Sequence, residues 1–372
     1  MAEIAIIATD SWYIWNLRSA TIRRFLKEGH SVAVYCGNAA YLPKLEALGV
    51  RPAHIPLDGR KIRPMRELKA LVLLALALKR DRPSAILSFN PKGNLFAGLI
   101  RRLFKFGWIA NVSGLGILGE AKGTRARAVA ALFRFAFRKV DHAFFQNDAD
   151  LGNWIENRIV PGDRASRQYG TGVDLDEFAN IEPPEGPVQV VCIARLLEKK
   201  GIGEYIALAA SVRERIPEVQ FLLAGSVVPE DQGGFPVDRI ALAEAEGHIR
   251  FLGMLEDVRP VLAGRTMGCL LTRYREGIPR SMIEFLATGR PILVSDFDGA
   301  EDIVSCAENG QIVDLNSATW MDSASKFIVK AATSPAYYAA LGRESRRLAE
   351  QRFDGDVGIS EYLNLIDDLT KR

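Results

Sequence analysis

Short runs of apolar residues alternate along this chain with longer segments in which apolar residues recur at helical spacing. The short runs predict buried strands, and the longer segments predict amphipathic helices. In the first half, strands are predicted at residues 3–9, 31–36, 53–57, 85–89, 108–112 and 143–146. Helices are predicted between them at residues 17–28, 66–79, 93–104 and 125–139. Such alternation predicts a parallel sheet with helices on both faces.

The alternation stops at residues 170–187 and then starts again. This stretch holds three prolines and three glycines around an acidic cluster, which is typical of a linker between domains. After it, strands are predicted at residues 188–194, 220–224, 249–252, 269–272, 292–295 and 311–313. Helices are predicted at residues 202–215, 236–246, 280–288 and 320–332, followed by a long helical tail at residues 335–371.

The pattern therefore predicts an α/β protein with two doubly wound, Rossmann-like domains that face each other across a cleft. We expect an N-terminal domain at residues 1–173, a C-terminal domain at residues 187–352, and a last helix at residues 353–372 that packs back on the N-terminal domain. A length of 372 residues suits two domains, each with its own core. Ligands of such sheets bind at the carboxyl ends of the strands, so the loops there are the candidates for a binding site.

Charge is distributed unevenly along the chain, although the formal net charge is only +3. Residues 1–180 contain 27 Lys and Arg against 16 Asp and Glu, a balance of +11, so the remainder carries −8. A basic half favours an anionic partner, such as a lipid surface, a phosphorylated acceptor or a nucleic acid; a solvated face without function is the alternative. The aromatic residues there form no recognisable stacking motif, so we predict no nucleic-acid partner.

The cysteines and the apolar runs indicate a cytoplasmic protein. The four cysteines are scattered, with no Cys-x-x-Cys pair, which argues against a disulfide framework or a zinc site. They are Cys36, Cys192, Cys269 and Cys306. The first residues read as a strand and not as a signal peptide. The longest apolar run, residues 70–78, has nine residues, well short of the ~20 that span a bilayer.

The segment at residues 274–291 contains the pattern most specific for chemistry. Glu276 and Glu284 are separated by seven residues, and Pro279 lies at the predicted start of a helix. A helix start presents backbone N–H groups and the positive end of the macrodipole, which stabilise an anionic oxygen. Glu284, further along the helix, can accept hydrogen bonds from two ribose hydroxyls. The alternative is a structural pair with Arg280, four residues earlier.

Two cations follow the first strand of the second half. Arg195 and Lys200 lie five residues apart in one loop. Both can converge on a single diphosphate, and the arginine can bind two of its oxygens at once. The alternative is a solvated charged turn.

Together these segments resemble the donor-binding signature of the family 4 retaining glycosyltransferases, which have the GT-B fold. The resemblance implies that Glu276 contacts the transferred sugar and that Glu284 holds the ribose. It also implies that the backbone of Gly277, Ile278 and Pro279 contacts the sugar and the phosphate.

The same resemblance assigns Arg195 and Lys200 to the diphosphate, as catalytic residues together with Glu276. It places the loop after Gly225 and the backbone near Met254 on either side of the nucleotide base.

The sequence departs from the family pattern at two positions. Ala194 replaces the usual glycine of the phosphate loop, and Glu301 stands where many relatives carry a basic residue. Asp296 and Asp298 have the Asp-x-Asp spacing that holds a divalent metal in the other glycosyltransferase fold, but the surrounding segment does not match. Because the cationic loop already supplies positive charge, we predict no metal and no cofactor.

Three segments of the first half follow predicted strands, so they share one edge of the predicted sheet. They contain Asn16, Arg18, Lys92, Asn111 and Ser113. Their pattern resembles the subgroup that extends polyprenyl-diphosphate-linked saccharides in bacterial cell-surface polysaccharide assembly. The resemblance implies that Arg18 or Lys92 holds the acceptor diphosphate and that Asn111 or Ser113 orients the acceptor hydroxyl. Many family members carry a histidine near residues 111–113; its absence here excludes a histidine base at that place.

A basic and apolar segment at residues 60–82 suggests contact with a membrane. Basic residues flank its apolar stretch: Arg60, Lys61, Arg63, Arg66, Lys69, Lys79 and Arg80. Each basic residue near an anionic leaflet contributes ~1 kcal/mol to binding. The hypothesis is peripheral docking on the inner face of the cytoplasmic membrane. The alternative is that the apolar side belongs to the domain core.

The resemblance implies a retaining glycosyltransferase that moves a hexose or an N-acetylhexosamine from a nucleotide diphosphate sugar, UDP-linked by analogy with the family, to a lipid-diphosphate-linked saccharide. One alternative is a sugar-nucleotide epimerase or hydrolase on the same fold. Another is a non-catalytic nucleotide-sugar-binding protein, against which the intact Glu276 and Glu284 argue.

Overall fold

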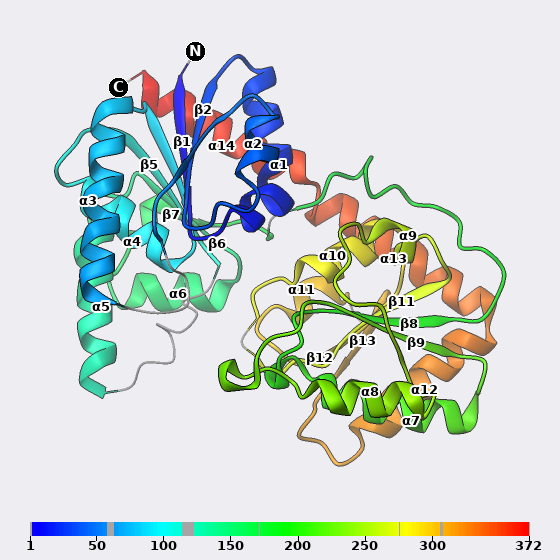
Figure 1. The fold of residues 1–372 in the computed structure, drawn as a ribbon. Coiled ribbons are helices and arrows are strands. Elements are labelled where there is room, and N and C mark those ends of the chain that lie inside the picture. The colour runs from blue at the N-terminus through cyan, green and yellow to red at the C-terminus, as the bar shows by residue number, and fades with distance from the viewer. Residues whose placement is uncertain are drawn as a thin grey trace. The chain divides into compact units, whose positions relative to one another are not determined.

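A computed structural model describes residues 2–57, 63–113, 123–170, 172–274, 276–305 and 308–371. The chain forms two compact units, which are Met1–Thr171 together with Gly355–Arg372, and Gly172–Asp354 (Figure 1). Arg60 and Lys61 of the predicted membrane segment, and Cys306, lie outside the described residues.

The first unit is built on a parallel sheet, of which seven strands lie in the described residues. They are β1 (Glu3–Ala8), β2 (Ser31–Cys36), β3 (Arg51–His54), β4 (Ala85–Phe89), β5 (Gly107–Val112), β6 (His142–Phe145) and β7 (Ala165–Arg167). Their order across the sheet is β3-β2-β1-β4-β5-β6-β7. All residues of β4 and β5 are buried, as expected for central parallel strands that are covered on both faces.

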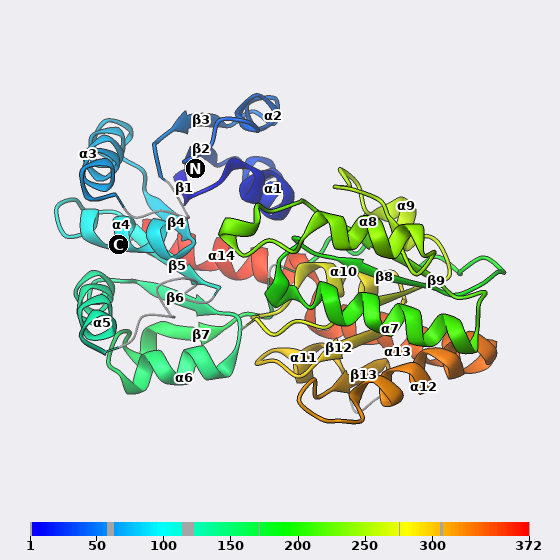
Figure 2. The same ribbon diagram turned by 60° about the horizontal axis from the view of Figure 1, so that its bottom comes forward.

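Helices pack on both faces of this sheet, and each face has its own apolar core. The core on one face includes residues of α3 (Pro64–Asp81), α4 (Pro91–Ile100), α5 (Gly123–Phe137) and α6 (Asp148–Glu156). The core on the other face includes residues of α1 (Ser11–Lys27), α2 (Leu42–Glu46) and α14 (Gly355–Thr370). Figure 2 shows α3, α4 and α5 on one side of the strands, with α1 and α14 on the other.

The second unit repeats this architecture with six strands in its described part. They are β8 (Gln189–Ile193), β9 (Gln220–Ala224), β10 (Arg250–Phe251), β11 (Thr266–Leu270), β12 (Ile292–Ser295) and β13 (Gly310–Val313), in the order β10-β9-β8-β11-β12-β13. Its helices are α7 (Ile202–Arg215), α8 (Val237–Ala245), α9 (Arg259–Leu262), α10 (Arg280–Ala287), α11 (Ala300–Ile303), α12 (Trp320–Thr333) and α13 (Pro335–Arg352). Two doubly wound sheets confirm the predicted α/β class.

Helix α1 begins earlier than the apolar spacing predicted, at Ser11 and not at residue 17. Asp10 caps it, because its Oδ1 accepts a hydrogen bond from Trp12 N at 2.9 Å. Asn16, expected before the helix, therefore lies within it, as Arg18 does.

The C-terminal tail consists of two helices, because helical conformation stops after α13 and resumes at Gly355, near the residue 353 predicted for the start of the last helix. α13 belongs to the second unit and α14 to the first. Ile359, Tyr362 and Ile366 of α14 are buried in the core that α1 shares. Residues 172–186, interpreted as a boundary and linker, belong to the second unit, where Arg346 donates to the carbonyl of Phe178 at 3.0 Å.

β7 and α6 were not predicted. β7 has only three residues, Ala-Ser-Arg, none of them fully buried. A strand of this kind carries no apolar run, and its place in the sheet comes from pairing with β6.

Candidate functional site

The loops after β8, β9 and β10 meet closely at one edge of the second sheet. Gly225, directly after β9, has φ +151°, and a Cβ there would lie 1.7 Å from the carbonyl oxygen of Ala194 after β8. Only glycine fits this close approach. Gly225 N donates to the carbonyl of Gly253 at 2.8 Å, and the next residue, Met254, is exposed. The structure thus brings the two predicted base-flanking positions together.

The loop that carries Lys200 is held against the end of β11. Gly201 has φ +72°, and a Cβ there would lie 1.7 Å from the carbonyl oxygen of Leu271. The carbonyl of Lys199 accepts hydrogen bonds from Thr272 Oγ1 at 3.1 Å and from Arg273 N at 2.7 Å. These contacts fix the backbone from which the Lys200 side chain extends.

Lys200 and Glu276 form an ion pair across this junction. Their side chains are 14% and 13% exposed, so water screens the pair only partly. Thr272 Oγ1 lies 3.3 Å from the same carboxylate oxygen, Glu276 Oε1. The Tyr274 ring centroid lies 5.8 Å from Lys200 Nζ. The structure therefore holds two of the predicted catalytic residues in one place.

Arg195, the third predicted catalytic residue, is exposed in the loop after β8. Within the described part of the chain, its side chain forms no ion pair or hydrogen bond with Glu276, and it makes no contact of this kind that would bring it to Lys200. Its own carbonyl accepts a hydrogen bond from Leu197 N at 2.8 Å. No side-chain hydrogen bond or ion pair with another described residue holds its guanidinium in place.

The start of α10 is shaped by the three predicted donor-binding residues before it. A Cβ on Gly299 would lie 2.1 Å from the carbonyl oxygen of Gly277, so the two backbones touch. Ile278 is buried. Pro279 is the N-cap residue and provides no side-chain cap, so its loop leaves N–H groups of the first turn to other acceptors. An anionic ligand is the kind of acceptor that such an end stabilises.

Glu284, in the middle of α10, pairs with Arg280 at 2.9 Å. This is the structural pairing that the sequence analysis left open as an alternative. Burial raises the pKa of the Glu284 carboxyl above its usual value, although Arg280 opposes the rise. Burial disfavours the ionised form of this carboxyl, so hydrogen-bond donors of a bound ligand would stabilise that form.

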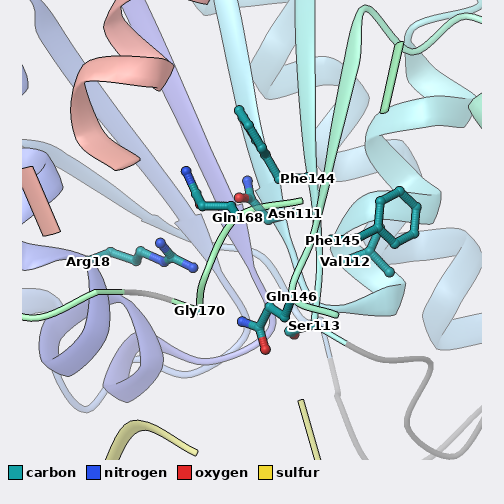
Figure 3. Close-up of a pocket in the computed structure, with 9 residues that line it drawn as sticks. All are labelled: Arg18, Asn111, Val112, Ser113, Phe144, Phe145, Gln146, Gln168 and Gly170. Carbon is teal, nitrogen blue, oxygen red and sulfur yellow. The ribbon is translucent and has the colours of Figure 1, made fainter. Parts of the chain in front are cut away.

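A pocket in the first unit collects three of the five predicted acceptor-binding residues. It is lined by Arg18, Asn111, Val112, Ser113, Phe144, Phe145, Gln146, Gln168 and Gly170. Figure 3 shows the Arg18 side chain extending from α1 toward the side where Asn111, Gln168 and Gly170 lie. The lining comes from α1 and from the ends of β5, β6 and β7, which is the carboxyl edge of the sheet.

Arg18 is an unusually buried cation, at 3% exposed. Its Cζ lies 4.1 Å from the centroid of the Phe89 ring, and Nη2 donates to the Tyr13 hydroxyl at 3.0 Å. Nε has no hydrogen-bond partner among the described residues. Burial lowers its pKa, but the phenols of Tyr13 and Tyr362 outweigh this, so the pKa is raised and the charge persists. A buried charge with an unsatisfied donor beside a pocket fits an anionic ligand.

The side chain of Asn111 takes part in a network of hydrogen bonds with other residues of the first unit. Tyr362 of α14 places its hydroxyl in hydrogen-bond contact with Asn111 Oδ1 and 2.8 Å from Gln168 Oε1. Asn111 Nδ2 donates to the Ser88 carbonyl at 3.4 Å, and the Asn111 carbonyl accepts from Asn94 Nδ2 at 2.8 Å. Because the amide of Asn111 is already engaged, Ser113 is the better candidate to meet an acceptor hydroxyl.

The other two predicted acceptor residues do not line this pocket. Asn16 Nδ2 donates to the Trp12 carbonyl one turn earlier in α1, at 3.0 Å. Lys92 pairs with Glu67 of α3 at 2.8 Å, and both side chains are largely buried. Because Lys92 lies outside the pocket lining, the structure does not bring it together with Arg18 at a common diphosphate site.

Tyr362, Gln168 and Gln146 were missed by the sequence reasoning. Tyr362 is distant in sequence from the residues that line the pocket. It lies in a helix whose apolar spacing predicts an ordinary core position for it. Gln168 follows the unpredicted β7. Gln146 follows β6. No local signal distinguishes any of the three residues, because each meets the site only through tertiary packing.

Among the described residues, no three His, Cys, Asp or Glu gather closely enough to hold a metal ion. In the same ranges, no helix has both the length and the apolar character needed to cross a bilayer.

Cys36, Cys192 and Cys269 are buried free thiols, and burial raises the pKa of Cys36 and of Cys192 to about 12.

Two family models match successive parts of the chain. The model for glycosyl transferases group 1 matches residues 174–347, and the model for the glycosyl transferase 4-like domain matches residues 17–165. A relative from Campylobacter jejuni, N,N'-diacetylbacillosaminyl-diphospho-undecaprenol alpha-1,3-N-acetylgalactosaminyltransferase, is 25% identical over 316 residues, which is 80% of this chain and 81% of the relative.

Solved structures of similar fold cover the whole chain. A glycosyltransferase from Rickettsia africae superposes with a TM-score of 0.79 at 13% identity, over 100% of this chain and 99% of that one. HepE of Anabaena in complex with UDP superposes with a TM-score of 0.78 at 14% identity, over 99% of this chain and 100% of that one.

The fold and these matches define a glycosyltransferase of the GT-B class, an enzyme that transfers sugars. Within that class, the chain belongs to the group 1, or family 4, glycosyltransferases.

Proposed function

We propose that this enzyme transfers a hexose or an N-acetylhexosamine, with retention of configuration, from a nucleotide diphosphate sugar to a lipid-diphosphate-linked saccharide. The observation that carries the proposal is the Lys200–Glu276 ion pair beside the start of α10, at the carboxyl edge of the second sheet. UDP is the first donor nucleotide to test, because structural neighbours contain UDP or UDP-glucose.

In this proposal the second unit stabilises the leaving diphosphate. Lys200, Arg195 and the α10 N-terminus supply positive charge, and no metal takes part. Glu276 positions the transferred sugar, and Glu284 accepts hydrogen bonds from the ribose. The bond from the anomeric carbon to the phosphate oxygen breaks, the acceptor oxygen bonds to that carbon on the same face, and the departing phosphate oxygen takes the acceptor proton.

The acceptor assignment rests on the pocket around Arg18 and on the Campylobacter relative, whose name specifies a sugar on diphospho-undecaprenol. A buried guanidinium with an unpartnered Nε suits a phosphate oxygen. Such acceptors are embedded in a bilayer, so we further propose that the enzyme works at the inner face of the cytoplasmic membrane in cell-surface polysaccharide synthesis.

The direct test is a screen of UDP- and GDP-sugars with a polyprenyl-diphosphate-linked saccharide. A new glycosidic bond with the anomeric configuration of the donor, read by NMR, is the expected product. Release or epimerisation of the donor sugar without acceptor would identify a hydrolase or an epimerase. Nucleotide-sugar binding without any turnover would identify a non-catalytic binder. Either outcome would overturn the proposal.

The raised pKa of Glu284 predicts a pH dependence of nucleotide binding. Ribose hydroxyls that donate to this carboxyl favour its ionised form, so binding displaces a proton while the pH lies below the raised pKa. UDP affinity is therefore expected to rise as the pH increases through that value. Glu284→Gln should bind UDP more weakly and lack this part of the rise. Calorimetric titration of both proteins checks it, since the titration of UDP itself is common to the two.

The same shift has a consequence for stability. The folded state binds more protons at Glu284 than the unfolded state, so its contribution is most favourable below the ordinary glutamate pKa and is lost as the pH rises through the raised one. The Tm of the wild type should accordingly fall relative to that of Glu284→Gln over this range. A difference in Tm that does not change with pH would contradict the assignment.

A further inference from the structure

Helix α3 has two apolar faces, and only one of them is in the core. Ala70, Leu74 and Leu78 are buried against the first sheet. Five further large apolar residues of α3 are exposed, and four of them, at 49% to 79%, are spaced along one side of the helix. These four are Met65, Leu68, Val72 and Leu76. Their spacing of three or four residues places them on one stripe of the helix. The expectation that this segment belongs to the domain core therefore holds for one face of α3, and the other face is exposed.

Exposed apolar residues also lie on or beside the neighbouring helices α4 and α5. α4 packs against both α3 and α5, and Figures 1 and 2 agree in showing the three helices side by side on one face of the sheet. Leu103, just after α4, and Leu132 and Phe135 of α5 are also exposed. We call these residues, with the stripe of α3, the apolar-basic surface. Exposed apolar groups gathered in this way usually mark a binding surface.

The charges around this surface are almost all positive. Residues 63–82 contain six basic and two acidic residues, and residues 123–139 contain five basic residues and no acidic one. Both acids are already paired, Glu67 with Lys92 and Asp81 with Arg80. The hydrogen bond from Arg80 is the main cause that lowers the pKa of Asp81 to about 2, so it stays ionised and paired.

The side chain of Arg102 joins the apolar and basic parts of the surface. Its guanidinium carbon lies 3.9 Å from the centroid of the Phe135 ring, and Nη1 lies 3.3 Å from the Phe135 carbonyl oxygen. An arginine that stacks on an exposed ring can keep its charge toward anionic groups while the ring enters an apolar layer.

We propose that the apolar-basic surface docks on an anionic lipid bilayer, with the α3 stripe in the headgroup boundary and the basic residues at the phosphates. Charge complementarity selects this occupant, because a second copy of the chain would set this basic face against another basic face. The docking itself does not depend on the proposed function. Only its role, which is to bring the enzyme to a lipid-linked acceptor, rests on that proposal.

The test compares two leucines of equal exposure. Leu76 on α3 and Leu242 on α8 of the second unit are each 58% exposed. Leu76→Gln combined with Leu68→Gln is expected to lower the fraction that sediments with phosphatidylcholine–phosphatidylglycerol vesicles by roughly tenfold. Leu242→Gln should sediment like the wild type. Binding of the wild type should weaken in high salt and be lost on pure phosphatidylcholine vesicles.

Activity measurements separate this proposal from the proposed function. The double variant should keep wild-type turnover of a short, water-soluble acceptor and lose turnover of an acceptor embedded in the vesicles. Absence of wild-type binding to the anionic vesicles at low salt would overturn the docking proposal, whatever the turnover. The docking proposal would also be overturned if the double variant bound vesicles like the wild type but differed from it in self-association. If no acceptor is turned over but the vesicle results hold, the proposed function fails and the docking surface stands.

Discussion

Glu276→Gln is expected to lower kcat about a hundredfold or more while the protein remains folded. In the proposed site, Glu276 positions the sugar and keeps Lys200 Nζ in place through their ion pair. Loss of one preorganised group of this kind costs ~3 kcal/mol of transition-state stabilisation. Steady-state kinetics with saturating donor and acceptor measures the effect.

Two controls separate catalysis from stability in this experiment. Breaking a largely buried pair leaves Lys200 uncompensated, so the double variant Lys200→Met, Glu276→Gln should recover Tm without recovering kcat. Glu204→Gln breaks the nearby, more exposed pair with Arg273, whose atoms lie 2.7 Å apart, and should change kcat by less than about twofold. Wild-type-like kcat in Glu276→Gln would remove the carboxylate from the mechanism.

Arg195→Ala tests the same mechanism from a position where folding is not at stake. Because Arg195 is exposed and makes no side-chain ion pair within the described residues, its removal should leave the Tm unchanged. A loss of kcat comparable to that of Glu276→Gln is expected, since the guanidinium would meet only the leaving diphosphate. An unchanged kcat would assign Arg195 to a solvated turn.

Arg18→Met is expected to lower kcat/KM for the acceptor by about thirtyfold or more, which corresponds to ~2 kcal/mol for a buried charged partner. Methionine can fill much of the same apolar site against Phe89 and removes the unsatisfied Nε. Replacing a buried charge by an apolar side chain of similar length is often neutral for stability. The donor KM and the Tm should therefore stay close to those of the wild type.

Lys92→Met is the matched control for Arg18→Met. Both cations were assigned to the acceptor diphosphate from the sequence, and the structure separates them. Lys92 is committed to Glu67, and it does not line the pocket. Lys92→Met leaves Glu67 uncompensated in a largely buried place, so it should lower the Tm. Because Lys92 does not line the pocket, we expect the acceptor KM to stay within about twofold of the wild type. A larger acceptor defect in Lys92→Met than in Arg18→Met would move the acceptor site away from the pocket.

The sequence by itself determined the class of the fold and pointed to the segments that we propose to carry the chemistry. Alternation of strand and helix periodicity is a local property, so it predicted two doubly wound sheets and most strand positions. The donor-binding pattern is local as well, because Glu276 and Glu284 lie on either side of one helix start, and Arg195 and Lys200 lie in one loop. Residue spacing alone places each pair in its own segment.

Only the tertiary structure decided which of these residues meet. Lys200 and Glu276 are 76 residues apart in the chain, and Tyr362 and Asn111 are 251 apart. The tertiary structure also decided the surroundings of two largely buried cations. Arg18 lines a pocket, whereas Lys92 forms an ion pair with Glu67. The physical reason is that periodicity reflects contacts along one helix or strand, whereas ion pairs, pockets and buried charges depend on elements that only folding brings together.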